Sequence, residues 1–102
     1  MHHDIEYDIM TVKKIAELRR RIEELRGQAQ VPSRELESLA KAIGRQPRKG
    51  GKHPMLEMPG RRPLPIPHHS RPMKNRTKEA ILTQFEGDIW AIEEELSNET
   101  RR

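Results

Sequence analysis

Histidines are the side chains of this sequence best suited to chemistry at neutral pH. His53, His68 and His69 fall within 17 residues of one another. Imidazole has an ordinary pKa of about 6.5, so it can accept or donate a proton near pH 7. Imidazole also binds metal ions, but adjacent residues of an extended chain point to opposite faces, and Glu57 is the only carboxylate nearby. The histidines are therefore candidates for proton transfer, with inert loop histidines as the alternative, and a metal site is not expected.

Positive charge surrounds these histidines. Residues 44–78 contain ten Lys and Arg residues and one acid, so the net charge of this segment is +9. Residues 1–43 have a net charge of 0 and residues 79–102 one of −5, which gives +4 for the chain. Because acids are almost absent from the basic segment, a surface that binds phosphate is favoured over a solvated basic loop. The candidates for nucleic-acid binding are Lys52, Arg61, Arg62, Arg71, Lys74 and Arg76.

Length and composition exclude several classes of protein. The chain has 102 residues, of which 32% are hydrophobic, 3% aromatic and 35% charged, so we expect one small domain without a deep apolar pocket. The absence of cysteine excludes disulfides and thiolate zinc sites. No apolar run is long enough for a membrane span or a secretory signal, and we expect a soluble cytoplasmic protein.

Two helices are predicted in the first half of the chain. Between Thr11 and Arg26, apolar residues recur at three- and four-residue steps with charges between them. This helix could pack on its own domain or serve self-association through the same apolar positions. After a break at residues 27–32, Ser33 is the expected N-cap of a helix through about Ile43, which Gly44 ends.

A three-stranded meander is predicted next, because residues 45–76 contain seven of the eight prolines and cannot continue a helix. Glycine-containing turns separate extended runs at about 45–49, 53–58 and 62–67. The prolines at 63, 65 and 67 remove the backbone donors along one side of the third run. That run is therefore expected at a sheet edge, with Leu64 and Ile66 facing the core.

A last helix follows, capped by Asn75 or Thr77 and bent or broken at Gly87. Its expected apolar positions are Ala80, Ile81, Phe85, Ile89, Ile92 and Leu96, with Trp90 beside them. The predicted class is α+β, with an α-β-β-β-α core and a three-stranded antiparallel sheet. This order resembles the architecture of double-stranded-RNA-binding domains, with an extra N-terminal helix.

An ordered set of short motifs resembles the HicA family, the ribonuclease toxins of bacterial toxin–antitoxin systems. The resemblance covers about residues 34–85, roughly half of the chain. After a leading helix come Gly51-Lys52-His53, Met58-Pro59-Gly60-Arg61-Arg62, Leu64-Pro65-Ile66-Pro67-His68 and Thr77-Lys78-Glu79-Ala80-Ile81-Leu82. It divides the chain into an N-terminal extension (1–32), a HicA-like domain (33–87) and an acidic helical extension (88–102).

The resemblance implies cleavage of mRNA without a metal or other cofactor, a catalytic histidine at His53, and neutralisation by a HicB-like antitoxin. One imidazole does not easily serve as acid and base at once, so His68 is the candidate helper. Lys52, Arg71 and Lys74 are candidates to hold phosphate. Two alternatives stay open: a non-catalytic RNA-binding module of the same fold, and a protein-interaction domain that docks through its first and last helices.

Overall fold

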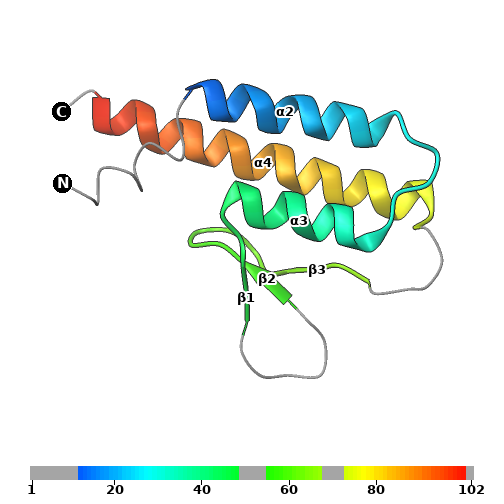
Figure 1. Cartoon of the computed structure of the whole chain (residues 1–102). Helices are drawn as coiled ribbons and strands as arrows, with labels where there is room; N and C mark the ends of the chain where they lie inside the picture. The colour runs from blue at the N-terminus through cyan, green and yellow to red at the C-terminus, as the bar shows by residue number, and fades with distance from the viewer. Residues whose placement is uncertain (1–11, 49–54, 68–72, 101–102) are drawn as a thin grey trace.

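The computed structural model describes residues 12–48, 55–67 and 73–100, which form three helices and a small sheet. The order is α2 (Val12–Arg26), α3 (Ser33–Ile43), β1 (Gln46–Pro47), β2 (Met55–Glu57), β3 (Leu64–Pro65) and α4 (Asn75–Thr100). Figure 1 shows the three helices side by side, with the sheet on the side of α3. The predicted α+β class and the positions of its helices are confirmed.

The predicted meander is confirmed, although its strands are shorter than expected. Both strand pairs are antiparallel, and β2 lies between β1 and β3. Met55 lies opposite Pro65, and Leu56 lies opposite Leu64. The proline-containing strand β3 is at the sheet edge, as predicted, and Ile66 beyond it is buried in the core while Leu64 packs against that core.

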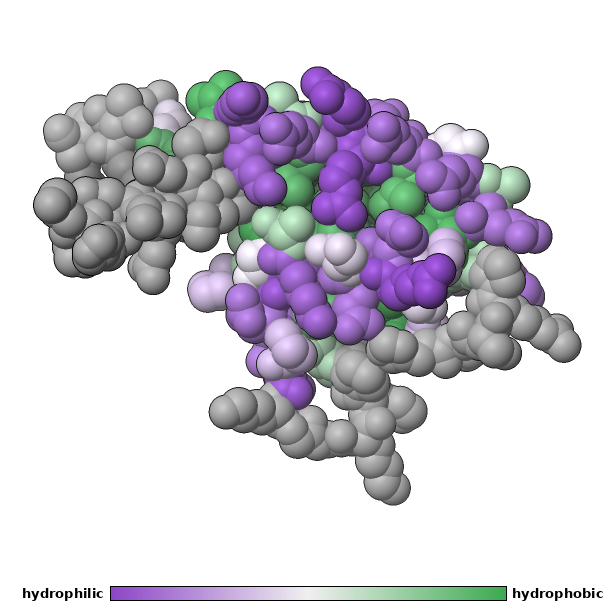
Figure 2. Space-filling view, viewed as in Figure 1, coloured by the Kyte–Doolittle hydropathy of each residue, from purple (hydrophilic) through white to green (hydrophobic). Residues whose placement is uncertain are grey.

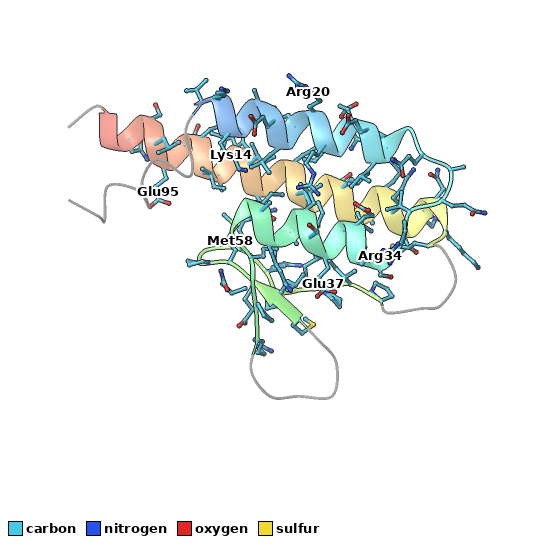
Figure 3. The ribbon with its side chains drawn as sticks, viewed as in Figure 1. Lys14, Arg20, Arg34, Glu37, Met58 and Glu95 are labelled. Carbon is cyan, nitrogen blue, oxygen red and sulfur yellow. The ribbon has the colours of Figure 1, made fainter. Side chains whose placement is uncertain are left out.

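The apolar face of α2 is buried within the chain. Ile15, Leu18, Ile22 and Leu25 have only 1–6% of their surface exposed and join one core with side chains of α3, α4 and the sheet. Figure 2 shows hydrophilic residues over the outer faces of α2 and α3, with hydrophobic residues in the seam between them. Arg20 projects from the outer side of α2 in Figure 3. The four apolar positions that could have served self-association are thus used for intramolecular packing.

Charged side chains join α2 to α4 at the rim of this core. Arg26 donates hydrogen bonds to Glu79 (3.0 Å) and Glu86 (3.0 Å) and forms an ion pair with Glu23 in its own helix. The hydrogen bond from Arg26 holds the pKa of the Glu86 carboxyl below its ordinary value, and the carboxylates raise the pKa of Arg26 in return. The C-terminal end of α2 is thereby fastened to the first half of α4.

The expected N-cap at Ser33 is wrong. Pro32 precedes the helix in an extended conformation, and Ser33 is the buried first residue of α3. Its hydroxyl donates instead to the carbonyl oxygen of Pro67, just beyond β3. Gly44 ends the helix, as predicted, with a φ of 128°, a conformation that residues with a side chain rarely adopt.

The last helix departs from its prediction in three ways. It begins at Asn75, so Thr77 lies within its first turn, and it continues through Gly87 without a break. Leu82 is fully buried, whereas Ala80 is exposed. Because α4 packs against α2 on one side and α3 on another, its buried surface is wider than a single stripe. No helix among the described residues is long and apolar enough to cross a membrane.

Candidate functional site

The residues expected to do chemistry lie outside the described part of the chain. His53 and Lys52 belong to residues 49–54, and His68 and Arg71 belong to residues 68–72. The structure does describe where these two segments attach to the fold, and those attachment points are the first element of the candidate site.

Both segments attach beside the same end of the sheet. The amide of Arg48 donates to the carbonyl oxygen of Met55 over 2.8 Å, so the two ends of segment 49–54 lie close together. Met55 in turn lies opposite Pro65, and Pro67, two residues further on, is the last described residue before segment 68–72. The sheet register therefore brings the start of β2 and the end of β3 to one edge of the fold.

The other attachment of segment 68–72 lies next to α3. The Met73 amide donates to the carbonyl oxygen of Val31 over 3.4 Å, and the Ser33 hydroxyl donates to the Pro67 carbonyl. Both ends of this segment are thus held by residues around the start of α3. Ser33, expected only as a helix cap, is a link between α3 and the chain that leads to His68.

Three of the predicted nucleic-acid ligands are exposed. Arg62, Lys74 and Arg76 lie on the surface, and their side chains have no hydrogen-bond or ion-pair partner among the described residues. Arg62 directly precedes the proline-rich stretch of β3, and Lys74 and Arg76 flank the first residue of α4. These three side chains, which we call the open cations, are available to bind phosphate.

Arg61 is placed differently from its neighbour. Its Nε donates to Oδ1 of Asp88 over 2.7 Å, and its Nη2 lies within 3.4 Å of the backbone and side-chain oxygens of Gln84. Only 28% of its side chain is exposed. Its charge is therefore compensated by a carboxylate of α4.

A buried charge network lies beneath Arg61. Arg45 and Asp88 are both fully buried and form a two-point ion pair, Nε to Oδ2 at 2.7 Å and Nη2 to Oδ1 at 2.8 Å. Arg45 also donates to the carbonyl oxygens of Leu56 (2.8 Å) and Arg62 (3.0 Å). Asp88 thus sits between two guanidinium groups, and the network joins the start of β1, strand β2 and the turn before β3 to α4.

Lys78 is a second cation turned inward. Its side chain is 1% exposed, and its Nζ donates to the carbonyl oxygens of Arg26 (2.9 Å) and Gln28 (2.6 Å). These oxygens belong to the C-terminal end of α2 and the residues after it, where carbonyls have no partner within the helix. Lys78 therefore caps α2 from α4.

The cations of the basic segment fall into two groups, those with a partner within the protein and those exposed without one among the described residues. Among its seven described cations, Arg45, Arg61 and Lys78 serve the network and the cap, and Arg48 pairs with Glu57 at 2.7 Å. The three open cations remain. The sequence signal that could have identified the buried pair is Asp88 itself, an acid within the apolar period of the last helix.

A groove of about 410 Å³ lies between β3 and the first half of α4, and one of the open cations, Arg62, forms part of its wall. None of the described residues that line it is acidic. Its walls are mostly apolar, with an arginine, a threonine and a glutamine as polar groups. The lining residues are Arg62, Pro63, Leu64, Pro65, Pro67, Thr77, Ala80, Ile81 and Gln84.

Among the described residues, no group of three or more His, Asp or Glu side chains is arranged to hold a metal ion. The histidines that could be weighed as ligands lie outside those residues. Comparison of the chain with protein-family models, curated proteins and solved structures found no match.

Gly87 leaves the space in which Arg61 packs on α4. A Cβ atom at Gly87 would come within 2.5 Å of Nη2 of Arg61, so a larger residue would displace the guanidinium. Alanine in a helix interior is favoured over glycine by about 1 kcal/mol. We expect Gly87→Ala to give little or no net stabilisation in the wild-type chain, but about 1 kcal/mol when Arg61 is also replaced by alanine. Urea unfolding of the four proteins in this double-mutant cycle measures the coupling, and equal effects in both backgrounds would contradict it.

Proposed function

We propose that this protein is a metal-independent endoribonuclease of the HicA kind, the toxin of a toxin–antitoxin pair, acting on mRNA in the cytoplasm with His53 as its catalytic residue. The observation that carries the proposal is the common attachment of segments 49–54 and 68–72. Both are anchored beside one end of an antiparallel sheet, through the Arg48–Met55 hydrogen bond and the Met55–Pro65 pairing. The order α3-β1-β2-β3-α4 supports a core like that of double-stranded-RNA-binding domains.

The proposed reaction needs two proton transfers. His53 takes the proton of a ribose 2′-hydroxyl, whose oxygen attacks the adjacent phosphorus. The bond to the 5′-oxygen breaks, and that oxygen receives a proton from His68, leaving a 2′,3′-cyclic phosphate and a 5′-hydroxyl. Lys52 and Arg71 stabilise the negative charge on the phosphorane between these steps. Electrons and protons balance without an oxidant or a metal.

The partners follow from the charge of the surface. RNA phosphates bind the open cations Arg62, Lys74 and Arg76, which have no competing carboxylate among the described residues around them. A HicB-like antitoxin would neutralise the toxin by covering the same face with acidic side chains.

Cleavage of RNA by the purified protein in the presence of a chelator tests the enzymatic proposal. We expect wild-type protein and the control variant His3→Ala to cut RNA at equal rates, and His53→Ala to be at least about 100-fold slower, since general acid–base catalysis contributes about 100- to 10,000-fold. Gel analysis of end-labelled RNA measures the rate. Intact RNA with all three proteins, or equal cleavage by His53→Ala, would contradict the proposal.

A non-catalytic RNA-binding module is the second candidate. It is favoured by the groove and its open cations, a surface that requires neither histidine. This candidate predicts intact RNA with all variants, but salt-dependent binding that survives His53→Ala and weakens when Arg62, Lys74 and Arg76 are neutralised. The absence of any RNA binding would instead favour a protein-interaction domain.

A further inference from the structure

The groove between β3 and α4 combines features of a base-binding site rather than of a strand- or helix-docking site. Pro65 of the edge strand β3 and Pro63 just before that strand line the groove, and neither has a backbone N–H. A partner strand added at this edge would therefore find no donors at these two positions, so that pairing of the β-augmentation kind is disfavoured.

The polar groups of the groove suit a nucleotide. Arg62 presents a planar guanidinium, on which bases stack, and its backbone is fixed because its carbonyl oxygen accepts a hydrogen bond from the buried Arg45 at 3.0 Å. The side-chain oxygen of Gln84 lies 3.4 Å from Arg61, which leaves the amide N–H groups of Gln84 to donate to a ligand. Thr77 adds a hydroxyl.

Charge complementarity identifies the occupant as an anion-bearing ligand. Among the described residues the groove has no acidic lining, and Arg62 forms part of its wall. Arg76 and Lys74 stand one and three positions before Thr77, which lines the groove from α4. Its volume of about 410 Å³ falls within the usual range of about 300–1,000 Å³ for small-ligand sites. An apolar groove with an arginine in its wall fits a flat base attached to a phosphodiester chain.

We propose that this groove binds one unpaired base of single-stranded RNA, with the neighbouring phosphates on Arg62, Lys74 and Arg76. The inference rests on the proposed RNA-binding function and extends it. It assigns unpaired RNA as the preferred substrate class, because a base within a duplex is stacked and cannot enter the groove.

Binding of two oligonucleotides tests this inference. The probes are a 2′-O-methyl uridine decamer, which cannot be cleaved through its 2′-oxygen, and an abasic decamer with the same methylated backbone. We expect the uridine decamer to bind the wild-type chain about fivefold more tightly. A base stacked on an aromatic side chain contributes about 5- to 150-fold, and the lower end applies because this groove offers an arginine and apolar side chains instead. Fluorescence anisotropy at low salt gives both dissociation constants.

Two matched variants locate the effect. Ala80→Phe fills the groove from an exposed position of α4, and Thr83→Phe places the same side chain on an exposed position that does not line the groove. We expect Ala80→Phe to lower the affinity for the uridine decamer to that of the abasic decamer, and Thr83→Phe to change neither affinity. Circular dichroism of each variant confirms that it is folded.

The outcomes separate this inference from the proposed function. If neither decamer binds, RNA binding itself is wrong. If both bind equally, RNA binding stands and base recognition is wrong. If the uridine preference survives Ala80→Phe, or is lost equally in Thr83→Phe, the base binds elsewhere and the groove assignment is overturned.

Discussion

Asp88→Ala is expected to lower the free energy of unfolding by about 3–5 kcal/mol, the usual cost of removing one partner from a buried ion pair. The variant would leave the guanidinium of Arg45 without a countercharge in a site where Arg45 has no exposed surface. It would also release Arg61, whose Nε donates to the same carboxylate. Small domains have total stabilities of about 5–15 kcal/mol, so this loss is a large part of the whole.

Urea unfolding followed by circular dichroism measures this effect, with Glu94→Ala as the control. Glu94 is an exposed acid on the same helix, and replacements at such positions usually change stability by no more than about 0.5 kcal/mol. A difference between the two variants of less than about 1 kcal/mol would contradict the role given to Asp88.

The double variant Arg45→Met with Asp88→Leu separates the charge from the hydrogen bonds. Replacing both partners by apolar residues removes the buried guanidinium that Asp88→Ala leaves unpaired, which often restores stability. Arg61 still loses its carboxylate, but 28% of its side chain is exposed, so its charge can be solvated. Here Arg45 also donates to the carbonyl oxygens of Leu56 and Arg62, and these would lose their donor. We therefore expect the double variant to be more stable than Asp88→Ala but less stable than the wild type.

The helices and the sheet order could be predicted from the local sequence, because the spacing of apolar residues and the positions of glycine and proline depend on the secondary structure. Leucine and isoleucine at helical spacing defined α2 and α3, and glycine fixed the end of α3. Alternating prolines placed β3 at the sheet edge, since they remove the backbone donors along one side of the strand and leave only the other side for pairing.

Features that depend on distant residues could not be predicted in this way. A serine before a helix is typical of an N-cap, but Ser33 bonds to a carbonyl 34 positions away. A glycine within a helix is typical of a break, but Gly87 makes room for Arg61 of the turn before β3. In both cases a residue distant in the sequence, Pro67 for Ser33 and Arg61 for Gly87, determines what the side chain or its absence does. The residues next to Ser33 and Gly87 in the sequence do not indicate these contacts.

The candidate site was predicted only in part for the same reason. Counting charge along the chain identified the basic segment, but it could not show which of its cations are buried or paired, and Arg61 was expected among the nucleic-acid ligands. Arg45 and Lys78 are buried and Arg61 is paired, while Arg62, only one residue along, is exposed. Side chains of equal charge thus divide between core and surface according to whether a carboxylate or a helix end lies within reach.

Lys78 provides the last test of this division, because its charge serves a helix end rather than an ion pair. Lys78→Met keeps most of the side-chain volume but removes both hydrogen bonds to the carbonyl oxygens of Arg26 and Gln28. Hydrogen bonds to charged groups contribute about 1.5–3 kcal/mol each, partly offset by the cost of burying the ammonium group. We expect a net loss of about 2–4 kcal/mol in the free energy of unfolding.

Lys74→Met is the matched control, since Lys74 is one helical turn earlier and its side chain is exposed. Because α2 would lose its cap, hydrogen exchange should increase first at the amides near the end of α2 in Lys78→Met, and remain unchanged there in Lys74→Met. Lys74→Met should in turn weaken RNA binding, since Lys74 is one of the open cations. Equal stability of the two variants would mean that Lys78 contributes no more to the free energy of unfolding than an exposed lysine. The two hydrogen bonds from Lys78 would then not stabilise the end of α2.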